Sequence, residues 1–213
     1  MNRINYQKQL EEVLKRMKEE GKRKRLLLHA CCAPCSSYCL EYLREAFALT
    51  VFFYNPNLTE QEEYRRRVEE EKRLIALMNG QEGSSQIEIL EGRYEPERFL
   101  EAAKGLETCK EGGERCVRCF ALRLGETARV AAEGGFDFFT TSLTISPLKN
   151  SALLNRIGAQ EGERYGVRFL PSDFKKNNGY LRSTQLSRLY GLYRQNYCGC
   201  IYSKVEASDR RQP

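Results

Sequence analysis

The sequence predicts an α/β fold in which one open sheet of parallel strands is covered by helices on both faces. Three observations indicate this architecture. Short apolar runs of strand length alternate with longer segments of helical period along the 213 residues. The apolar runs are continuous, which is typical of parallel strands buried on both sides. Hydrophobic residues make up 41% of the chain, enough for one compact core, so we expect a single domain.

The first half of the chain supplies an opening helix and three strands. Apolar residues at helical spacing predict an amphipathic helix over residues 4–20, which ends at Gly21. The elements expected after it are strands at 25–30 and 49–54 with a helix at 36–47 between them, a long charged helix at 60–79, a weaker strand at 87–90 and a helix at 95–104.

The second half continues the alternation, with a helix at residues 116–133, a strand at 136–142, a helix at 150–165 and a strand at 167–170. Repeated strand–helix–strand units form parallel sheets with right-handed crossovers, so the expected architecture is a Rossmann-like open sheet. The expected single domain spans residues 1–213, with a helical extension over 1–24, the functional core over 25–203 and a flexible tail over 204–213.

Charge and apolar content argue against a membrane-bound or secreted protein. No run approaches the roughly 18 to 20 apolar residues that cross a bilayer, and the opening MNRINYQKQLEEVLKRMKEEGK is too charged for a secretory signal. We therefore expect a cytoplasmic protein without a membrane partner. The net charge is +6, and the basic runs at residues 22–25 and 65–67 suit either phosphate contact or a solvated helix face.

Four of the nine cysteines fall within HACCAPCSSYC, residues 29–39, directly after the first predicted strand. Because cytoplasmic thiols stay reduced, these cysteines indicate metal ligands or redox groups rather than disulfides. Open parallel sheets bind their ligands beyond the carboxyl ends of the strands. Residues 55–57 and 140–142 follow two other predicted strands, so we expect them at the same edge as the cysteines.

The other clustered cysteines form two pairs. Cys116 and Cys119 lie one turn apart at a predicted helix start, so their sulfurs share a face, and Cys198 and Cys200 flank a glycine. The adjacent Cys31 and Cys32 are expected to project in different directions. That arrangement fits two neighbouring centres better than one tetrahedral metal.

Several kinds of site remain open from the residues alone. Two cysteine pairs can build a structural zinc site, and Cys32 with Cys35 has the spacing of a thioredoxin-like redox motif. An iron–sulfur cluster would take four thiolates and leave three for a second metal with an open position. We expect Cys39 to be a buried inert thiol, Cys109 to lie in a polar loop and His29 to be a packed core residue. No phosphate-binding loop or dinucleotide fingerprint is present.

Five segments occur in an order that resembles a known family. They are LLLHACCAPC, FFYNPN, EGGERCVRCFALRL, GFDFFTTSLTISPLKN and GYLRSTQLSRLYGLYRQNYCGCIYS, which together cover most of residues 26–203. In this order they resemble the cobalamin-independent epoxyqueuosine reductases, also called QueH. The resemblance implies the last step of queuosine biosynthesis, in which epoxyqueuosine at the first anticodon position of tRNA loses its epoxide oxygen.

The resemblance also implies cofactors and ligands. The family uses a 4Fe-4S cluster, a separately bound iron and electrons from an external low-potential donor. Carried over by motif, the cluster ligands are Cys32, Cys116, Cys119 and Cys198, and the ligands of the second iron are Cys31, Cys35 and Cys200. A rival allocation places the cluster on Cys31, Cys32, Cys116 and Cys119 and makes Cys198 and Cys200 a redox-active pair. Cys35 stands where many members carry an aspartate, which would make the iron site softer.

The same resemblance suggests how substrate is handled. The second iron would act as a Lewis acid on the epoxide oxygen, which makes Cys31, Cys35 and Cys200 candidate catalytic residues. Tyr202 is a candidate proton source, with ordinary packing as the alternative. The residues proposed to contact the tRNA substrate are Thr141, Ser142, Lys149, Arg182 and Arg194.

Two other functions compete with the reductase. A zinc-stabilised RNA-binding protein without redox chemistry would use the same cysteines as structural ligands. A tRNA thiolation enzyme on a related fold ranks third, because HACCAPC occupies the position where such enzymes carry a glycine loop for ATP.

Overall fold

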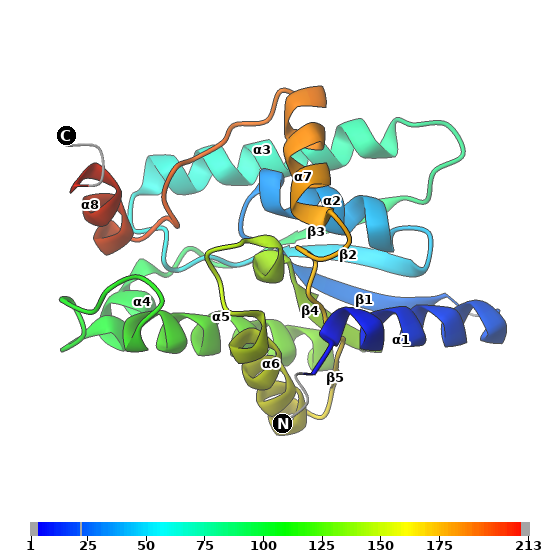
Figure 1. Cartoon of the computed structure of the whole chain (residues 1–213), viewed down its shortest axis with the longest axis horizontal. Coiled ribbons are helices and arrows are strands. Elements are labelled where there is room, and N and C mark those ends of the chain that lie inside the picture. Colours follow the sequence, from blue (N-terminus) through cyan, green and yellow to red (C-terminus); the bar gives the residue numbers. More distant parts are fainter. Residues whose placement is uncertain (1–3, 22, 210–213) are drawn as a thin grey trace.

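The computed structural model describes residues 4–21 and 23–209, and its strands form a five-stranded, all-parallel sheet (Figure 1). The strands are β1 (Lys24–His29), β2 (Phe47–Phe53), β3 (Ile87–Glu91), β4 (Phe138–Thr141) and β5 (Arg168–Phe169), in the spatial order β3-β2-β1-β4-β5. The predicted α/β class and all five predicted strands are confirmed. The strand order reverses at β1, so the ends of β1 and β4 flank the crevice where such sheets bind ligands.

The central strand β1 is buried on both sides because its residues are apolar without alternation. Leu26 and Leu28 pack into the core on one face of the sheet, and Leu27 packs into the core on the other. All three side chains are fully buried, and each such burial contributes roughly 1.5–3 kcal/mol. This two-sided burial fixes the position of the chain that leaves β1 toward the cysteines.

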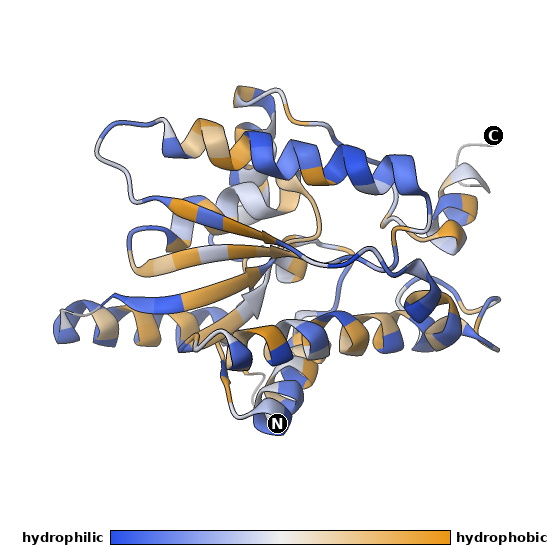
Figure 2. Ribbon diagram, turned by 180° about the vertical axis from the view of Figure 1, so that it is seen from behind, coloured by the Kyte–Doolittle hydropathy of each residue, from blue (hydrophilic) through white to orange (hydrophobic). Residues whose placement is uncertain are grey.

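Helices cover both faces of the sheet. The helices are α1 (Tyr6–Glu20), α2 (Ala33–Leu43), α3 (Gln61–Asn79), α4 (Pro96–Ala103), α5 (Glu114–Glu133), α6 (Ser151–Tyr165), α7 (Gly179–Leu189) and α8 (Ile201–Asp209). Apolar residues of α1, α2, α3 and α7 share one core, whereas α5 and α6 pack on the opposite side. Figure 2 shows apolar residues concentrated on the strands and hydrophilic residues on the outer surface of α3.

The ends of several elements differ from the sequence prediction. The helix expected at residues 36–47 is α2, which begins at Ala33 and ends at Leu43 because Phe47 already starts β2. Helix α7 and the short helix at Ser142–Ile145 were not predicted, and residues 204–209, expected in the tail, belong to α8. The opening helix is confirmed and ends at Gly21, whose φ of 64° suits glycine.

The carboxyl ends of the strands point toward a region built by α4, α8 and the start of α5 (Figure 1). Phe99 and Ala103 of α4 pack there against Cys119 of α5 and Cys200. Among the residues described, no helix combines the length and apolar character needed to cross a membrane.

Candidate functional site

Three segments that follow strands meet at the carboxyl edge of the sheet, as predicted. His29 Nδ1 lies 2.9 Å from Thr141 Oγ1, which joins the ends of β1 and β4. Asn55 donates from Nδ2 to the carbonyl oxygen of Ala30 (2.9 Å), which joins β2 to the start of the cysteine segment. The backbone N–H of Cys31 donates to Ser142 Oγ (3.3 Å). These bonds hold Cys31 at the crevice where the strand order reverses.

Cys31, Cys32 and Cys35 form a thiol trio. Their sulfur atoms all lie within 4.8 Å of one another, and the sulfurs of Cys31 and Cys32 are 3.8 Å apart. The expectation that Cys31 and Cys32 project in different directions is therefore wrong. Side chains alternate only along a continuous strand, whereas β1 ends at His29 and Cys32 already caps the start of α2.

The trio shares its negative charge unequally. Hydrogen bonds from Cys32 and Cys35, together with the nearby cations Arg123 and Lys149, hold the pKa of Cys31 well below its ordinary value despite its burial. Hydrogen bonding to Cys31 raises the pKa of Cys32 to about 12, and it also raises that of Cys35. One thiolate supported by two thiols is thus ready to bind a metal, which would displace the remaining protons.

A buried carboxyl group supports the helix that carries the trio. Glu71 of α3 lies with Oε1 2.5 Å from Ser36 Oγ, which is also 3.2 Å from the carbonyl oxygen of Cys32. Burial raises the pKa of Glu71 to about 8. Ser36 Oγ donates to Glu71 Oε1, a bond that opposes the rise in pKa but is outweighed by burial. The Ser36 side chain thus links the buried carboxyl group to the backbone beside the trio.

Cys116, Cys119, Cys198 and Cys200 form a second group, the thiol quartet. All four line one cavity of about 90 Å³. Cys116 and Cys119 lie on successive turns of α5, and the other two lie in the segment between α7 and α8. The backbone N–H of Gly112 donates to the sulfur of Cys116 (3.2 Å).

The two thiols on α5 hold their protons more tightly than free thiols do. Burial and the neighbouring Cys198, Cys116 and Cys200 raise the pKa of Cys119 to about 12, although Arg123 opposes the shift. Burial also raises the pKa of Cys116, with contributions from Cys198 and Cys200. Four thiolates lining one small cavity would need cations to balance their charge. The donor set therefore fits a thiolate-bound metal group.

The segment that carries Cys198 and Cys200 is fixed by its backbone and by α3. Gly199 has a φ of 126°, a conformation that L side chains rarely adopt, and a Cβ there would clash with Leu58. Arg67 donates from Nη1 to the carbonyl oxygen of Cys198 (3.2 Å) and forms a 2.7 Å ion pair with Glu63. Sequence reasoning missed Arg67, although its spacing from Glu63 on a helix indicated that pair.

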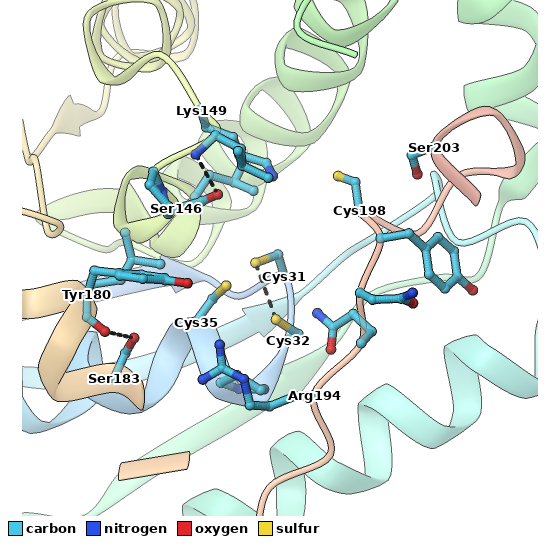
Figure 3. A pocket seen from close by; sticks show the side chains of 18 of the residues that line it. Cys31, Cys32, Cys35, Ser146, Lys149, Tyr180, Ser183, Arg194, Cys198 and Ser203 are labelled. Carbon is cyan, nitrogen blue, oxygen red and sulfur yellow. Dashed lines mark hydrogen bonds between the residues drawn. The ribbon is translucent and has the colours of Figure 1, made fainter. Parts of the chain in front are cut away.

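A larger cavity of about 320 Å³ opens onto the trio (Figure 3). Lys149, Arg194 and Tyr180 line it together with the three thiols and Cys198. Cys198 also lines the smaller cavity, so it lies between the two thiol groups. Burial disfavours the charge of Lys149, but the neighbouring Cys198, Cys31 and Cys35 outweigh it and raise the pKa of Lys149 above its usual value.

The candidate substrate residues divide into two sets. Lys149 and Arg194 line the larger cavity, and Ser142 contacts Cys31 at its edge. Thr141 is buried and accepts from the backbone N–H of Leu143 (3.1 Å), so it acts as a local cap. Arg182 forms a two-point ion pair with Glu41 (2.6 and 2.9 Å) and does not line that cavity.

Tyr202 lies outside both thiol-lined cavities. Its ring packs 6.3 Å from that of Phe99 and 4.6 Å from the guanidinium of Arg115, and it lines a separate cavity that includes Cys109. The packing alternative for Tyr202 thus has direct support. Cys39 is buried, as expected, and donates to the carbonyl oxygen of Cys35 (3.4 Å).

His29 is a packed core residue, as predicted. It is fully buried, and its Nε2 lies 3.1 Å from the carbonyl oxygen of Tyr54 and 3.3 Å from Arg123 Nε. Burial and the charge of Arg123 lower the pKa of His29 to about 3, so the imidazole is neutral. His29 links the end of β1 to Thr141 and Tyr54, and its neutral imidazole lacks the extra proton that a general acid would donate.

Comparisons with known proteins match nearly the whole chain. The profile of the family described as "Epoxyqueuosine reductase QueH" matches residues 26–206, which include all seven thiols of the two groups. A relative from Streptococcus pyogenes named epoxyqueuosine reductase QueH is 43% identical over 208 residues, which is 97% of this chain and 81% of the relative. Relatives of the same name from Staphylococcus epidermidis and Staphylococcus aureus are 41% and 39% identical; each alignment covers 96% of this chain, and 86% and 85% of the respective relative.

Proposed function

The chain belongs to the epoxyqueuosine reductase QueH family, and from this premise we propose that it reduces epoxyqueuosine in tRNA to queuosine. The reaction removes the epoxide oxygen as water and leaves an alkene, which consumes two electrons and two protons. The observation that carries the proposal is that seven thiols line two cavities, which share Cys198, at the carboxyl edge of the sheet. The reducing cytoplasm is the compartment that suits a site built from free thiols.

The thiols suit a 4Fe-4S cluster and a separate iron. When bound, the iron would polarise the epoxide oxygen, and the cluster would supply electrons singly from an external low-potential donor. The grouping of the sulfurs supports a cluster on the quartet and an iron on the trio. This division exchanges Cys32 and Cys200 relative to the allocation carried over by motif. Metal analysis of the Cys32→Ser and Cys200→Ser variants distinguishes the two allocations.

The larger cavity suits a modified base displaced from an anticodon loop. Tyr180 is 42% exposed although it lines the cavity, so an aromatic face is open for stacking at the entrance. Arg194 and Lys149 supply positive charge for the adjoining phosphates or for polar atoms of the base. Figure 3 shows Tyr180 and Arg194 near Cys35 in this cavity, and we propose that a bound base enters there beside the trio.

Lys149 is a cationic side chain that lines the same cavity as the trio. Nearby cysteines hold its pKa above the usual value, so it carries a proton at neutral pH. We propose that the Lys149 ammonium hydrogen-bonds to the departing oxygen. Tyr202 is the alternative proton source, and unchanged turnover of Tyr202→Phe beside a defective Lys149→Gln would favour the lysine.

The proposed reaction is tested on tRNA that carries epoxyqueuosine. Protein reconstituted with iron and sulfide without oxygen is mixed with the tRNA and a chemical reductant, and the nucleosides are analysed by mass spectrometry. We expect conversion to queuosine by the wild type and by Cys109→Ser, a control cysteine outside both groups. Protein that holds a full complement of sulfide but leaves epoxyqueuosine intact would contradict the proposal.

A further inference from the structure

Arg123 of α5 is a buried cation with an unusual set of partners. Its side chain is 1% exposed. It donates from Nη2 to Asn55 Oδ1 (2.5 Å) and from Nε to His29 Nε2 (3.3 Å). Nη1 has no hydrogen-bond partner within the residues described. Since Asn55 and His29 are both neutral, neither balances the charge of the guanidinium.

The other buried arginines each have a carboxylate partner. Arg67 pairs with Glu63 at 2.7 Å, Arg115 with Glu206 at 3.1 Å and Arg44 with Glu45 at 3.7 Å. Over residues 4–21 and 23–209, no comparable ion pair is found for Arg123. Burying a cation without an anion is costly, so its charge requires a counter-ion of another kind.

Cysteines lie near Arg123 along the chain and in space. Cys116, Cys119 and Arg123 are spaced by three and four residues along α5, so they lie on one face of the helix. Nε of Arg123 contacts His29 at the end of β1, two residues before Cys31. Burial lowers the pKa of Arg123, and Cys119, Cys198 and Cys31 oppose that effect and raise it. The guanidinium charge therefore acts on thiols of both groups.

We propose that Arg123 is a positioning residue that supplies the counter-charge for both metal-bound thiolate groups and raises the reduction potential of the cluster. The inference rests on the proposed function, because it requires that a cluster be bound. Each reduction adds one negative charge to the centre, and a fixed cation beside it stabilises the reduced form. Its bonds to His29 and Asn55 tie that cation to the ends of β1 and β2, so the distance to the thiolates is fixed.

The test compares three variants of the reconstituted protein. Arg123→Gln removes the charge, Arg123→Lys keeps it, and Arg118→Gln removes a charge from the exposed side of the same helix, where Arg118 pairs loosely with Glu114 at 3.8 Å. Sulfide content is measured first, and the potential is then obtained by redox titration followed by electron paramagnetic resonance. We expect a lower potential in Arg123→Gln and potentials near the wild-type value in the other two variants.

Two results would overturn the inference. One is an unchanged potential in Arg123→Gln with full sulfide, which would leave Arg123 as a packing residue. The other is an equal loss of sulfide from Arg123→Lys and Arg123→Gln. That result would show that the hydrogen-bond geometry of Arg123, and not its charge, retains the cluster. Wild-type protein that takes up no sulfide would instead contradict the proposed function, and with it the role of Arg123.

Discussion

The trio and the quartet are built in different ways. The trio spans five consecutive residues and depends on one junction, where β1 ends and α2 begins. The quartet joins α5 to a segment about 80 residues further along the chain and forms only when both are packed. The trio opens onto the larger cavity, whereas Cys119 and Cys200 are buried against α4. Under the proposed function, substrate would meet the trio, and a cluster on the quartet would be shielded from solvent.

The supporting groups of the two regions differ as well. The trio is backed by Glu71, a carboxyl group that burial keeps protonated up to about pH 8. The quartet is backed by the cation Arg123 and is held in place by Arg67. A neutral carboxyl group fixes geometry without adding charge, while a cation also favours the anionic state. A change at Glu71 should therefore affect the trio alone, whereas a change at Arg123 acts on both groups.

The largest effect is expected from a ligand of the quartet. Cys119→Ser removes a buried sulfur that no neighbouring thiol replaces, so sulfide content and turnover should both fall to background. The loss of turnover should exceed the roughly 10- to 100-fold effect typical of residues that hydrogen-bond to metal ligands. Sulfide analysis and the tRNA assay measure the two quantities. Full sulfide retention by this variant would remove Cys119 from the proposed cluster.

A ligand of the trio should give a different pattern. Cys31→Ser removes the thiolate that Cys32 and Cys35 support, so turnover should fall at least about 100-fold while sulfide content stays near the wild-type value. Iron and sulfide per chain are measured together with turnover. Loss of sulfide in parallel with activity would show that both groups hold one centre.

The carboxyl group behind the trio makes stability depend on pH. Because the folded pKa of Glu71 is about 8, above its ordinary value of 4.5, its protonation stabilises the fold at low pH and this contribution is lost as pH rises from 4.5 to 8. The loss is up to about 1.4 kcal/mol per pH unit. Glu71→Gln keeps the hydrogen-bonding group without the charge, so its denaturant-derived stability should fall less over that window. Equal slopes for the two proteins would refute the buried-carboxyl account.

Gly199 tests the backbone that positions the quartet. Gly199→Ala places a Cβ against Leu58 at a positive φ, and we expect a loss of about 1–3 kcal/mol in the free energy of unfolding, with partial loss of sulfide. Gly191, which has a φ of 56° and open space around it, is the matched control. Gly191→Ala should lose stability through its backbone while keeping its sulfide. Equal sulfide loss in both variants would argue against a specific role for Gly199.

The smallest effect is expected at the entrance of the larger cavity. Arg194→Gln should weaken tRNA binding a few-fold and reduce the slope of log affinity against log salt by about 0.7, the value for one contact to single-stranded RNA. Arg182→Gln is the control, since Arg182 is paired with Glu41 outside that cavity. A larger effect at Arg182 would relocate the RNA contact to α7.

The sequence predicted the parts of the molecule that depend on local pattern. The five strands were recognisable because their apolar runs are buried on both faces, and the cysteine segment was placed at the carboxyl edge by the end of β1 alone. Helix α7 was missed because GYLRSTQLSRL is mostly polar and has only a narrow buried face. The proximity of Cys31 to Cys32 was also missed, since it depends on the turn between strand and helix.

The sequence pattern did not identify side chains whose contacts lie far along the chain. Helical spacing relates Arg67 to Glu63 and Arg123 to Cys119, but spacing within one helix does not show that these arginines point inward. Their roles emerge only when α3 and α5 pack against segments that are distant in the chain. The count of four thiols plus three was available from the sequence, but the membership of each group depends on that packing.

The central claim is that the seven thiols hold a cluster and a separate metal. The direct test is to purify the protein without oxygen, reconstitute it with iron and sulfide, and quantify iron, acid-labile sulfide and zinc per chain alongside the visible spectrum. The account predicts about four sulfides and about five irons. Zinc without sulfide, persisting after reconstitution, would contradict it and would favour a zinc-stabilised RNA-binding protein.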